Sequence, residues 1–375
     1  MPPIKLERQD VAAEGDLVVT VNNQIEVRVQ SQFLTMLSPA FRTMLGPDWL
    51  KDQSLLSISA AEPGKLALPD DDGEAMRLLF LILHNQNNLL PYLPMPRNLL
   101  DLAKVADKSQ YRCLPATKIA FTLWFSRVLR ATTQYEHLAA AYIVDDPGAF
   151  HQFSRSIILG QDSNKIRELC KKVMDAGDEF GLGAIIQLRH QVLHKVVAGG
   201  VAYMVEEMSK KLTSSEYDHQ VNVEVLFAGQ DVPRGHCRYY HDAVVQQLRL
   251  LSDDGIWPEA CRTDSLTAIR DRLKARQLAP SPLPGYRGAR RCCEAHNDNW
   301  FKQHFEPGMK AFTKIAENMN VQMCLDCLKS PTGQYDGICR DIYQHRPKII
   351  PRAPMAAPVE IRDYLVQVRQ EFGDV

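Results

Sequence analysis

The hydrophobic pattern of the first third of the chain predicts a small β-sheet. Residues 16–21 (DLVVTV) and 25–30 (IEVRVQ) are short runs rich in β-branched residues, and Asn22-Asn23-Gln24 lies between them. Such runs around a tight turn, in which asparagine tolerates a positive φ, are typical of a β-hairpin. The runs 55–59 and 65–69 have a similar composition and predict two further strands.

A break in an apolar segment predicts a pair of helices. The segment SQFLTMLSPAFRTML (31–45) is interrupted by Ser38-Pro39 and then resumes. Serine is a favoured N-cap because its hydroxyl accepts a hydrogen bond from an otherwise unpaired backbone N–H. Proline fits the first helical position, where its missing N–H is not needed. We therefore expect one short helical segment at 31–37 and a second helix that begins with AFRTML.

Helical periodicity continues over most of the remaining chain. Asp70-Asp71-Asp72-Gly73 is expected to cap a buried helix, because carboxylates are favourable at the positive end of the helix dipole. The predicted helices are 74–86, 98–110, 113–129, 135–144, 149–159, 164–177, 182–212, 239–258, 265–278, 297–319 and 359–372. A further strand is predicted at 221–227.

The composition is that of an ordinary folded protein with two or three domains. The chain has 375 residues, 45% of them hydrophobic and 24% charged, and a formal net charge of -1. This balance does not favour nucleic acid or an anionic membrane as a partner. The apolar run 78–84 is too short to span a bilayer, and the N-terminus lacks the apolar core of a signal peptide. We expect an intracellular protein, in the nucleus or the cytoplasm, whose cysteines are thiols or metal ligands.

The candidate metal ligands are cysteine and histidine residues in the last third. Cys324 and Cys327 form a C-x-x-C pair, which offers two thiolates from one turn, half of the tetrahedral shell that Zn²⁺ prefers. The other half could come from Cys292 or Cys293 together with His296. The combination with Cys293 and His296 would complete a closed, structural Cys₃His site. Two alternatives stay open: a partly buried helical stretch with inert thiols, and a redox dithiol, which here lacks the preceding strand. Zinc is the one cofactor that the sequence suggests.

The other candidate motifs do not predict catalysis. His190 and His194 stand four residues apart on a predicted helix, but Gln191 occupies the place where a zinc protease needs glutamate. Two histidines on one helix face are more often packing or surface residues. The chain contains no phosphate-binding G-x-x-x-x-G-K-[ST] and no G-x-S-x-G. No catalytic residue is predicted, and we expect that the chain is not an enzyme.

The order of elements in the first third resembles the BTB/POZ domain. The resemblance rests on the strand hairpin, the SPAF-type helical hairpin, two short strands, DD-x-EAM opening a buried helix, and LLDLAKVADK with CL after it. It covers roughly residues 12–128 and is most similar to the form common in filamentous-fungal proteins. The helical segments that follow are similar to the extension found after the domain in those proteins.

The resemblance implies an α+β fold and a division of the chain. We expect a BTB/POZ-like domain at 12–128, with a short mixed sheet flanked by helices, followed by a mainly α-helical region. That region would comprise a helical extension at 129–213 and a C-terminal domain with the zinc site at 214–345. A Pro-rich tail with a terminal helix would follow at 346–375.

The resemblance also implies a function in protein–protein interaction, as a scaffold or adaptor. The first helical segment and the exposed edge of the first strand would form the interface, with a second copy or another BTB-containing protein as the partner. The residues expected there are Phe33, Leu34, Leu37, Val19 and Val21. One alternative is a substrate adaptor of a cullin-based ubiquitin ligase, and another is a zinc-dependent enzyme built on the C-terminal region.

Overall fold

The chain divides into two compact units. The structure, a computed structural model, describes residues 7–46, 59–108, 111–128, 134–178, 180–213, 249, 251–256, 259, 263–275 and 323–329. Unit 1 comprises Met1–Ile157 and Gln322–Pro347, and unit 2 comprises Ile158–Val321 and Lys348–Val375.

Unit 1 begins with a four-stranded mixed sheet whose strand order is β1-β3-β2-β4. The strands are β1 (Glu7–Asp10), β2 (Leu17–Val21), β3 (Ile25–Val29) and β4 (Gly64–Leu68). β2 and β3 are antiparallel, whereas β1 pairs with β3 and β4 pairs with β2 in parallel. Together with the helices that follow, this sheet confirms the mixed α+β class.

The predicted hairpin is confirmed at the residues that join β2 and β3. Asn22 and Asn23 have positive φ angles of 48° and 52°. The Gln24 N–H donates a hydrogen bond of 3.0 Å to the Val21 carbonyl and closes the turn. Asparagine adopts this left-handed region at lower cost than most residues, which explains why the turn forms here.

Strand β1 was not expected from the sequence. Its residues, ERQD, are all polar and show none of the apolar alternation that marks a half-buried strand. β1 pairs through its backbone with β3, in the register Glu7 with Ile25 and Asp10 with Arg28. A strand that contributes little to the core can be found only through this pairing.

The Ser38-Pro39 break is a helix start, as predicted. α1 (Ser31–Leu37) ends there and α2 (Pro39–Met44) begins, with proline in the first turn. The fully buried Ser38 hydroxyl accepts from the Phe41 N–H at 3.2 Å and donates to the Tyr111 carbonyl. The cap therefore also ties α2 to a residue far along the chain.

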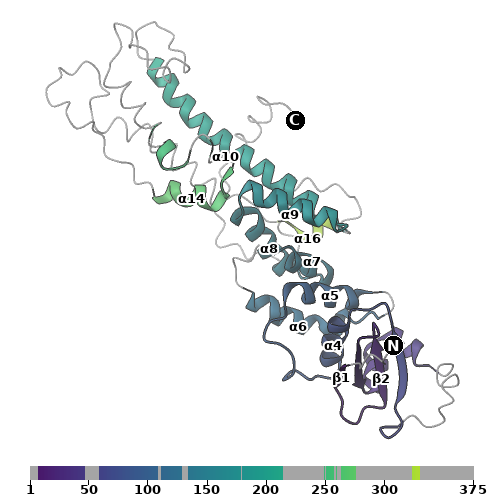
Figure 1. Cartoon of the computed structure of the whole chain (residues 1–375). Helices are drawn as coiled ribbons and strands as arrows, with labels where there is room; N and C mark the ends of the chain where they lie inside the picture. Colours follow the sequence, from purple (N-terminus) through teal and green to yellow (C-terminus); the bar gives the residue numbers. More distant parts are fainter. Residues whose placement is uncertain are drawn as a thin grey trace, which may run out of the picture. The chain divides into compact units, whose positions relative to one another are not determined.

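The helices of unit 1 follow one another away from the sheet (Figure 1). They are α4 (Gly73–Leu83), α5 (Pro96–Asp107), α6 (Leu114–Arg127), α7 (Tyr135–Val144) and α8 (Pro147–Gly160). α4 packs against β3, and α5 and α6 pack against α4. α7 packs against α5 and α6, so unit 1 continues beyond residue 128, where we expected the first domain to end.

Aromatic side chains fill the core of unit 1. The Phe41 ring lies 4.9 Å from the Tyr111 ring and 6.2 Å from the Phe80 ring, measured between centroids. The Phe125 ring lies 5.5 Å from Phe153 of α8. Rings at such distances pack favourably beyond their buried area. One group of rings therefore joins α2 to α4, and another joins α6 to α8.

Unit 2 contains α9 (Ser163–Asp175), α10 (Leu182–Thr213) and α14 (Leu266–Ala275), and α9 packs along α10. These helices correspond to predicted ones. The predicted elements 221–227, 297–319 and 359–372, and most of 55–59 and 239–258, lie outside the described residues. None of the helices in the described ranges combines the length and apolar composition needed to cross a membrane.

The Ser38→Ala variant tests whether the Ser38 hydroxyl both caps α2 and holds α2 to Tyr111. Removal of the Ser38 hydroxyl leaves the Phe41 N–H without its side-chain acceptor and leaves the Tyr111 carbonyl with only the weaker Cys113 thiol, at 3.4 Å. We expect the free energy of unfolding, measured with urea, to fall by about 2 kcal/mol. Ser126→Ala is the control, because its exposed hydroxyl bonds only the Leu123 carbonyl of its own helix. Equal stability of the two variants would contradict this role.

Candidate functional site

Helix α1 is fixed at its start by hydrogen bonds from two other elements. The Asp16 carboxylate accepts from the Ser31 N–H at 2.7 Å and from the Ser31 hydroxyl at 2.6 Å. The Gln30 N–H donates to Nε2 of the buried His84 at 2.9 Å, and His84 Nδ1 lies 2.8 Å from the Phe80 carbonyl. His84 is therefore the neutral tautomer with its proton on Nδ1. Burial lowers the pKa of His84, which favours this form.

One side of α1 exposes large apolar residues. Phe33, Met36 and Leu37 have exposed fractions of 46%, 63% and 40%. Residues three and four apart share one helix face, so these three side chains form one surface, which we call the α1 face. The Phe33 ring meets the His84 imidazole edge-on, with centroids 5.2 Å apart. A fixed helix thus presents apolar side chains to the solvent.

The structure separates the five residues expected at the interface. Phe33 and Leu37 lie on the α1 face, whereas Leu34, Val19 and Val21 are fully buried. Leu34 is on the opposite side of α1 and belongs to the core. Val19 and Val21 lie in β2, which is paired on both edges, with β3 and β4. These three residues are core residues and are not available to a partner.

Two features of this region were not predicted from the sequence: the exposure of Met36 and the identity of the edge strand. Met36, which was not expected at the interface, shares the helix face of Phe33 because it lies three residues further along. β2 was expected at an edge of the sheet but lies inside it. The edge strand next to β3 is β1. Arg8 and Asp10 form an exposed ion pair of 3.2 Å on that strand, and charged residues are usual on sheet edges.

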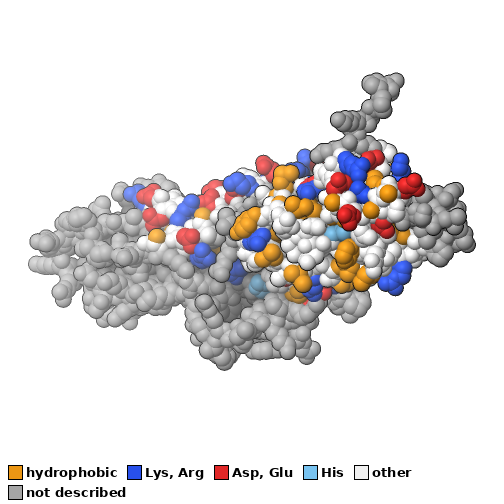
Figure 2. Space-filling model, turned by 90° about the horizontal axis from the view of Figure 1, so that it is seen from below, with side chains coloured by type: hydrophobic (Ala, Val, Ile, Leu, Met, Phe, Trp, Pro, Cys, Tyr) orange, Lys and Arg blue, Asp and Glu red, His pale blue; other side chains and the backbone are white. Residues whose placement is uncertain are grey.

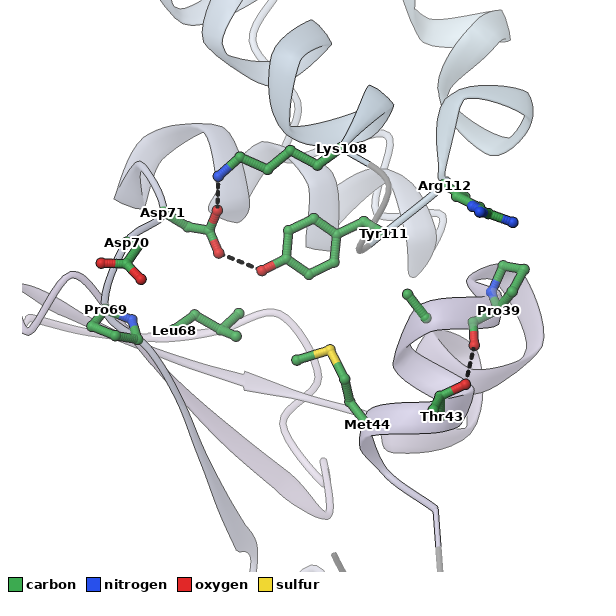
Figure 3. Close-up of a pocket in the computed structure, with 11 residues that line it drawn as sticks. Pro39, Thr43, Met44, Leu68, Pro69, Asp70, Asp71, Lys108, Tyr111 and Arg112 are labelled. Carbon is green, nitrogen blue, oxygen red and sulfur yellow. Dashed lines mark hydrogen bonds and ion pairs between the residues drawn. The ribbon is translucent and has the colours of Figure 1, made fainter.

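A second candidate site is a pocket of about 760 Å³ beside α2 and β4 (Figure 3). Asp71, only 5% exposed, lies between two partners: Lys108 Nζ at 2.6 Å from one carboxylate oxygen, and the Tyr111 hydroxyl, which donates to the other. Asp72, not Asp71, is the N-cap of α4 and accepts from the Ala75 N–H at 2.8 Å. The three consecutive aspartates therefore have different roles, and Asp70 is exposed.

Three polar groups of the pocket, those of Asp71, Lys108 and Tyr111, bind one another. Burial, followed by the hydrogen bond to Asp71 and its charge, raises the pKa of Tyr111 far above the ordinary value for tyrosine. The phenol stays protonated and acts as a donor, while both Asp71 oxygens accept hydrogen bonds. Such a cluster joins the start of α4 to the end of α5. It stabilises the fold and leaves neither Tyr111 nor Asp71 as an available base.

The histidine pair of unit 2 is a packing feature. His190 and His194 of α10 are 2% and 7% exposed, and their ring centroids lie 4.3 Å apart. His190 Nε2 is 3.4 Å from the Gln161 carbonyl. Burial, together with the neighbouring His194, lowers the pKa of His190 to about 4. Two buried rings packed in this way agree with the interpretation of the pair as packing residues.

The expected zinc ligands fall partly outside the described residues. Cys327 lies in the short helix α16 (Leu325–Leu328), Cys324 is its N-cap, and both are half-buried. Cys293 and His296 lie outside the described part, so the Cys₃His site stays a prediction. Among the residues that the structure describes, no three histidine, cysteine or acidic side chains are grouped to hold a metal.

Another cysteine, Cys170 of α9, is fully buried. Burial raises the pKa of its thiol to about 11, which makes that thiol unreactive.

Comparison with known proteins adds no relative: no family model, no curated protein and no solved structure matches this chain. The BTB/POZ resemblance stays a prediction from the sequence.

The Asp71→Ala variant tests the buried cluster. It removes the partner of the Tyr111 hydroxyl and of Lys108, so we expect the free energy of unfolding to fall by about 2 kcal/mol. Asp70→Ala is a matched control at the neighbouring, exposed position and should change it by less than about 0.5 kcal/mol. A urea titration of each variant measures both values. A similar effect of the two substitutions would disprove the assigned roles.

The histidine pair predicts a loss of stability in acid. His190 binds a proton near its ordinary pKa of 6.5 when unfolded, but only near 4 when folded. The contribution of neutral His190 to the free energy of unfolding is therefore complete above pH 6.5 and is lost as the pH falls towards 4. Between pH 7.5 and pH 5, the wild-type chain should lose about 1–2 kcal/mol more unfolding free energy than His190→Gln. The control is Gln191→Ala, at an exposed position of the same helix, which should keep the wild-type pH dependence. If the unfolding free energy of His190→Gln depended on pH as that of the wild-type chain does, the loss of stability in acid would not come from His190.

Proposed function

We propose that this chain is a protein–protein interaction scaffold or adaptor without catalysis of its own, and that the α1 face is part of its binding surface. The observation that supports this is the exposure of Phe33, Met36 and Leu37 on a helix that is fixed from beneath. The partner would be a second copy of the chain or another BTB/POZ-like protein, as the sequence resemblance implies.

Energetics favour binding at such a face. Burying apolar surface contributes roughly 25 cal/mol per Å², before the costs of association are subtracted. Those costs are lower on α1, because Asp16 and His84 already hold the helix and Leu34 anchors it in the core. Large apolar side chains on a rigid support are typical of the central residues of an interface.

Three side chains are too few for a whole interface. A stable interface usually buries about 800 Å² on each partner. Hydrophobic side chains also reach the surface elsewhere on the described part of the molecule, where several groups alternate with charged residues (Figure 2). The α1 face would thus be one part of a larger contact. The cullin adaptor and the zinc-dependent enzyme stay predictions from the sequence, and no contact among the described residues favours either.

Charge introduced on the α1 face should weaken association. We expect Phe33→Asp, Met36→Asp or Leu37→Asp to shift a dimer of the full-length chain towards the monomer, with a dissociation constant raised at least tenfold. Sedimentation velocity over a range of concentrations measures this shift.

Ile119→Asp provides the control. Ile119 is an 83% exposed apolar residue of α6, so its substitution introduces the same charge on a different helix. Circular dichroism checks that all variants are folded. If the α1 variants and the wild-type chain had the same mass distribution while Ile119→Asp dissociated, the binding surface would have to be sought elsewhere.

A further inference from the structure

A short segment far along the chain is part of unit 1. The main part of the unit ends at Ile157, and the chain rejoins it at Gln322. The described part of the returning chain is Met323–Lys329, which includes α16 and lies against α7 and α8 (Figure 1). We call it the 323–329 segment.

Two apolar side chains of the segment are buried. Met323 and Leu325 are 0% and 1% exposed. The Met323 N–H donates a hydrogen bond of 3.1 Å to the hydroxyl of Ser154, a fully buried residue of α8. That hydroxyl in turn donates to the His151 carbonyl at 3.0 Å. The buried Ser154 hydroxyl therefore accepts a hydrogen bond from the backbone of the segment.

A cation holds the other end. Lys329 Nζ lies 3.1 Å from an Asp145 carboxylate oxygen and 4.9 Å from the centre of the Tyr142 ring. Asp145 is the C-cap of α7, with a φ of 58°. The C-terminal end of a helix carries a partial negative charge and favours a cation there. Carboxylate, ring and helix end together form a site for a positive group.

Apart from its two buried side chains and the Met323 hydrogen bond, little holds the segment in its site. A helix of four residues is not stable alone and forms here through its contacts with unit 1. The ion pair is about one-third exposed on both sides, and such pairs contribute little. Residues 161–322 lie between α8 and the segment in the sequence, so no tight turn holds the segment in place.

We propose that the surface of α7 and α8 is a binding site for a short helical segment with a defined motif. The motif is two apolar anchors two residues apart, as Met323 and Leu325, followed four residues later by a cation, as Lys329. The 323–329 segment occupies the site in cis and is exchanged for the same motif on another protein. This proposal does not depend on the α1 face.

A labelled peptide of residues 320–332 tests the site in the full-length chain under reducing conditions. Fluorescence anisotropy measures its binding to the wild-type chain and to Leu325→Asp, in which the resident segment has lost an anchor. We expect binding to Leu325→Asp to be at least tenfold tighter than to the wild-type chain. A peptide that itself carries Leu325→Asp should bind neither chain.

A charge exchange checks that the peptide binds at the α7–α8 surface. Adding Asp145→Lys to the Leu325→Asp chain should weaken the peptide at least fivefold, and a Lys329→Asp peptide should regain that loss. A folded Leu325→Asp chain that does not bind the peptide, or that binds it equally well with Asp145→Lys and does not distinguish the two peptides, would overturn the proposal.

Hydrogen exchange supplies a second measurement that needs no variant. Release of the segment predicts that the Met323 amide of the wild-type chain exchanges at least tenfold faster than the slowest amides of α7. Exchange of both at the same slow rate would make the segment a fixed part of the core and the proposal wrong. A Leu325→Asp chain that fails to fold would lead to the same conclusion.

Discussion

The structure of unit 1 depends on the contacts of one buried residue, Tyr111. Its carbonyl accepts from the Ser38 hydroxyl, its ring lies 4.9 Å from the Phe41 ring, and its hydroxyl donates to Asp71. Through these contacts it joins the start of α2, the start of α4 and the end of α5. Ser38 and Asp71 are also buried, so water cannot replace either of the two hydrogen bonds, and losing one of them is costly in free energy.

The position of α1 follows from this arrangement. The Ser38 N–H donates to the Leu34 carbonyl at 3.0 Å, so the residue that caps α2 also ends α1. The other end of α1 is held by Asp16 and by the neutral His84. A helix with both ends fixed cannot rotate to bury its outer side. The exposure of Phe33 and Met36 is therefore a consequence of the internal hydrogen bonds, and it is this exposure that supports a binding role.

Local features were predictable from the sequence, and long-range ones were not. Ser38-Pro39 and Asn22-Asn23 were identified correctly because a cap and a tight turn depend on neighbouring residues alone. The different roles of Asp71 and Asp72 depend on Lys108 and Tyr111, which no local pattern links to them. Val19 and Val21 were placed at an edge because the pairing of β2 with β4, and the polar strand β1, could not be foreseen. In a helix as short as α1, the periodicity also left open whether Phe33 or Leu34 faces the core.

The two proposed surfaces of unit 1 would bind under different conditions. On the α1 face the apolar side chains are already exposed, so its affinity depends on the area that a partner covers. On α7 and α8 the site is filled by the 323–329 segment, and a competing motif binds only in the fraction of molecules in which the segment has left. Its apparent dissociation constant is the intrinsic value divided by that fraction. The strength of the Met323, Leu325 and Lys329 contacts would therefore set the concentration at which a partner binds α7 and α8 in addition to one on the α1 face.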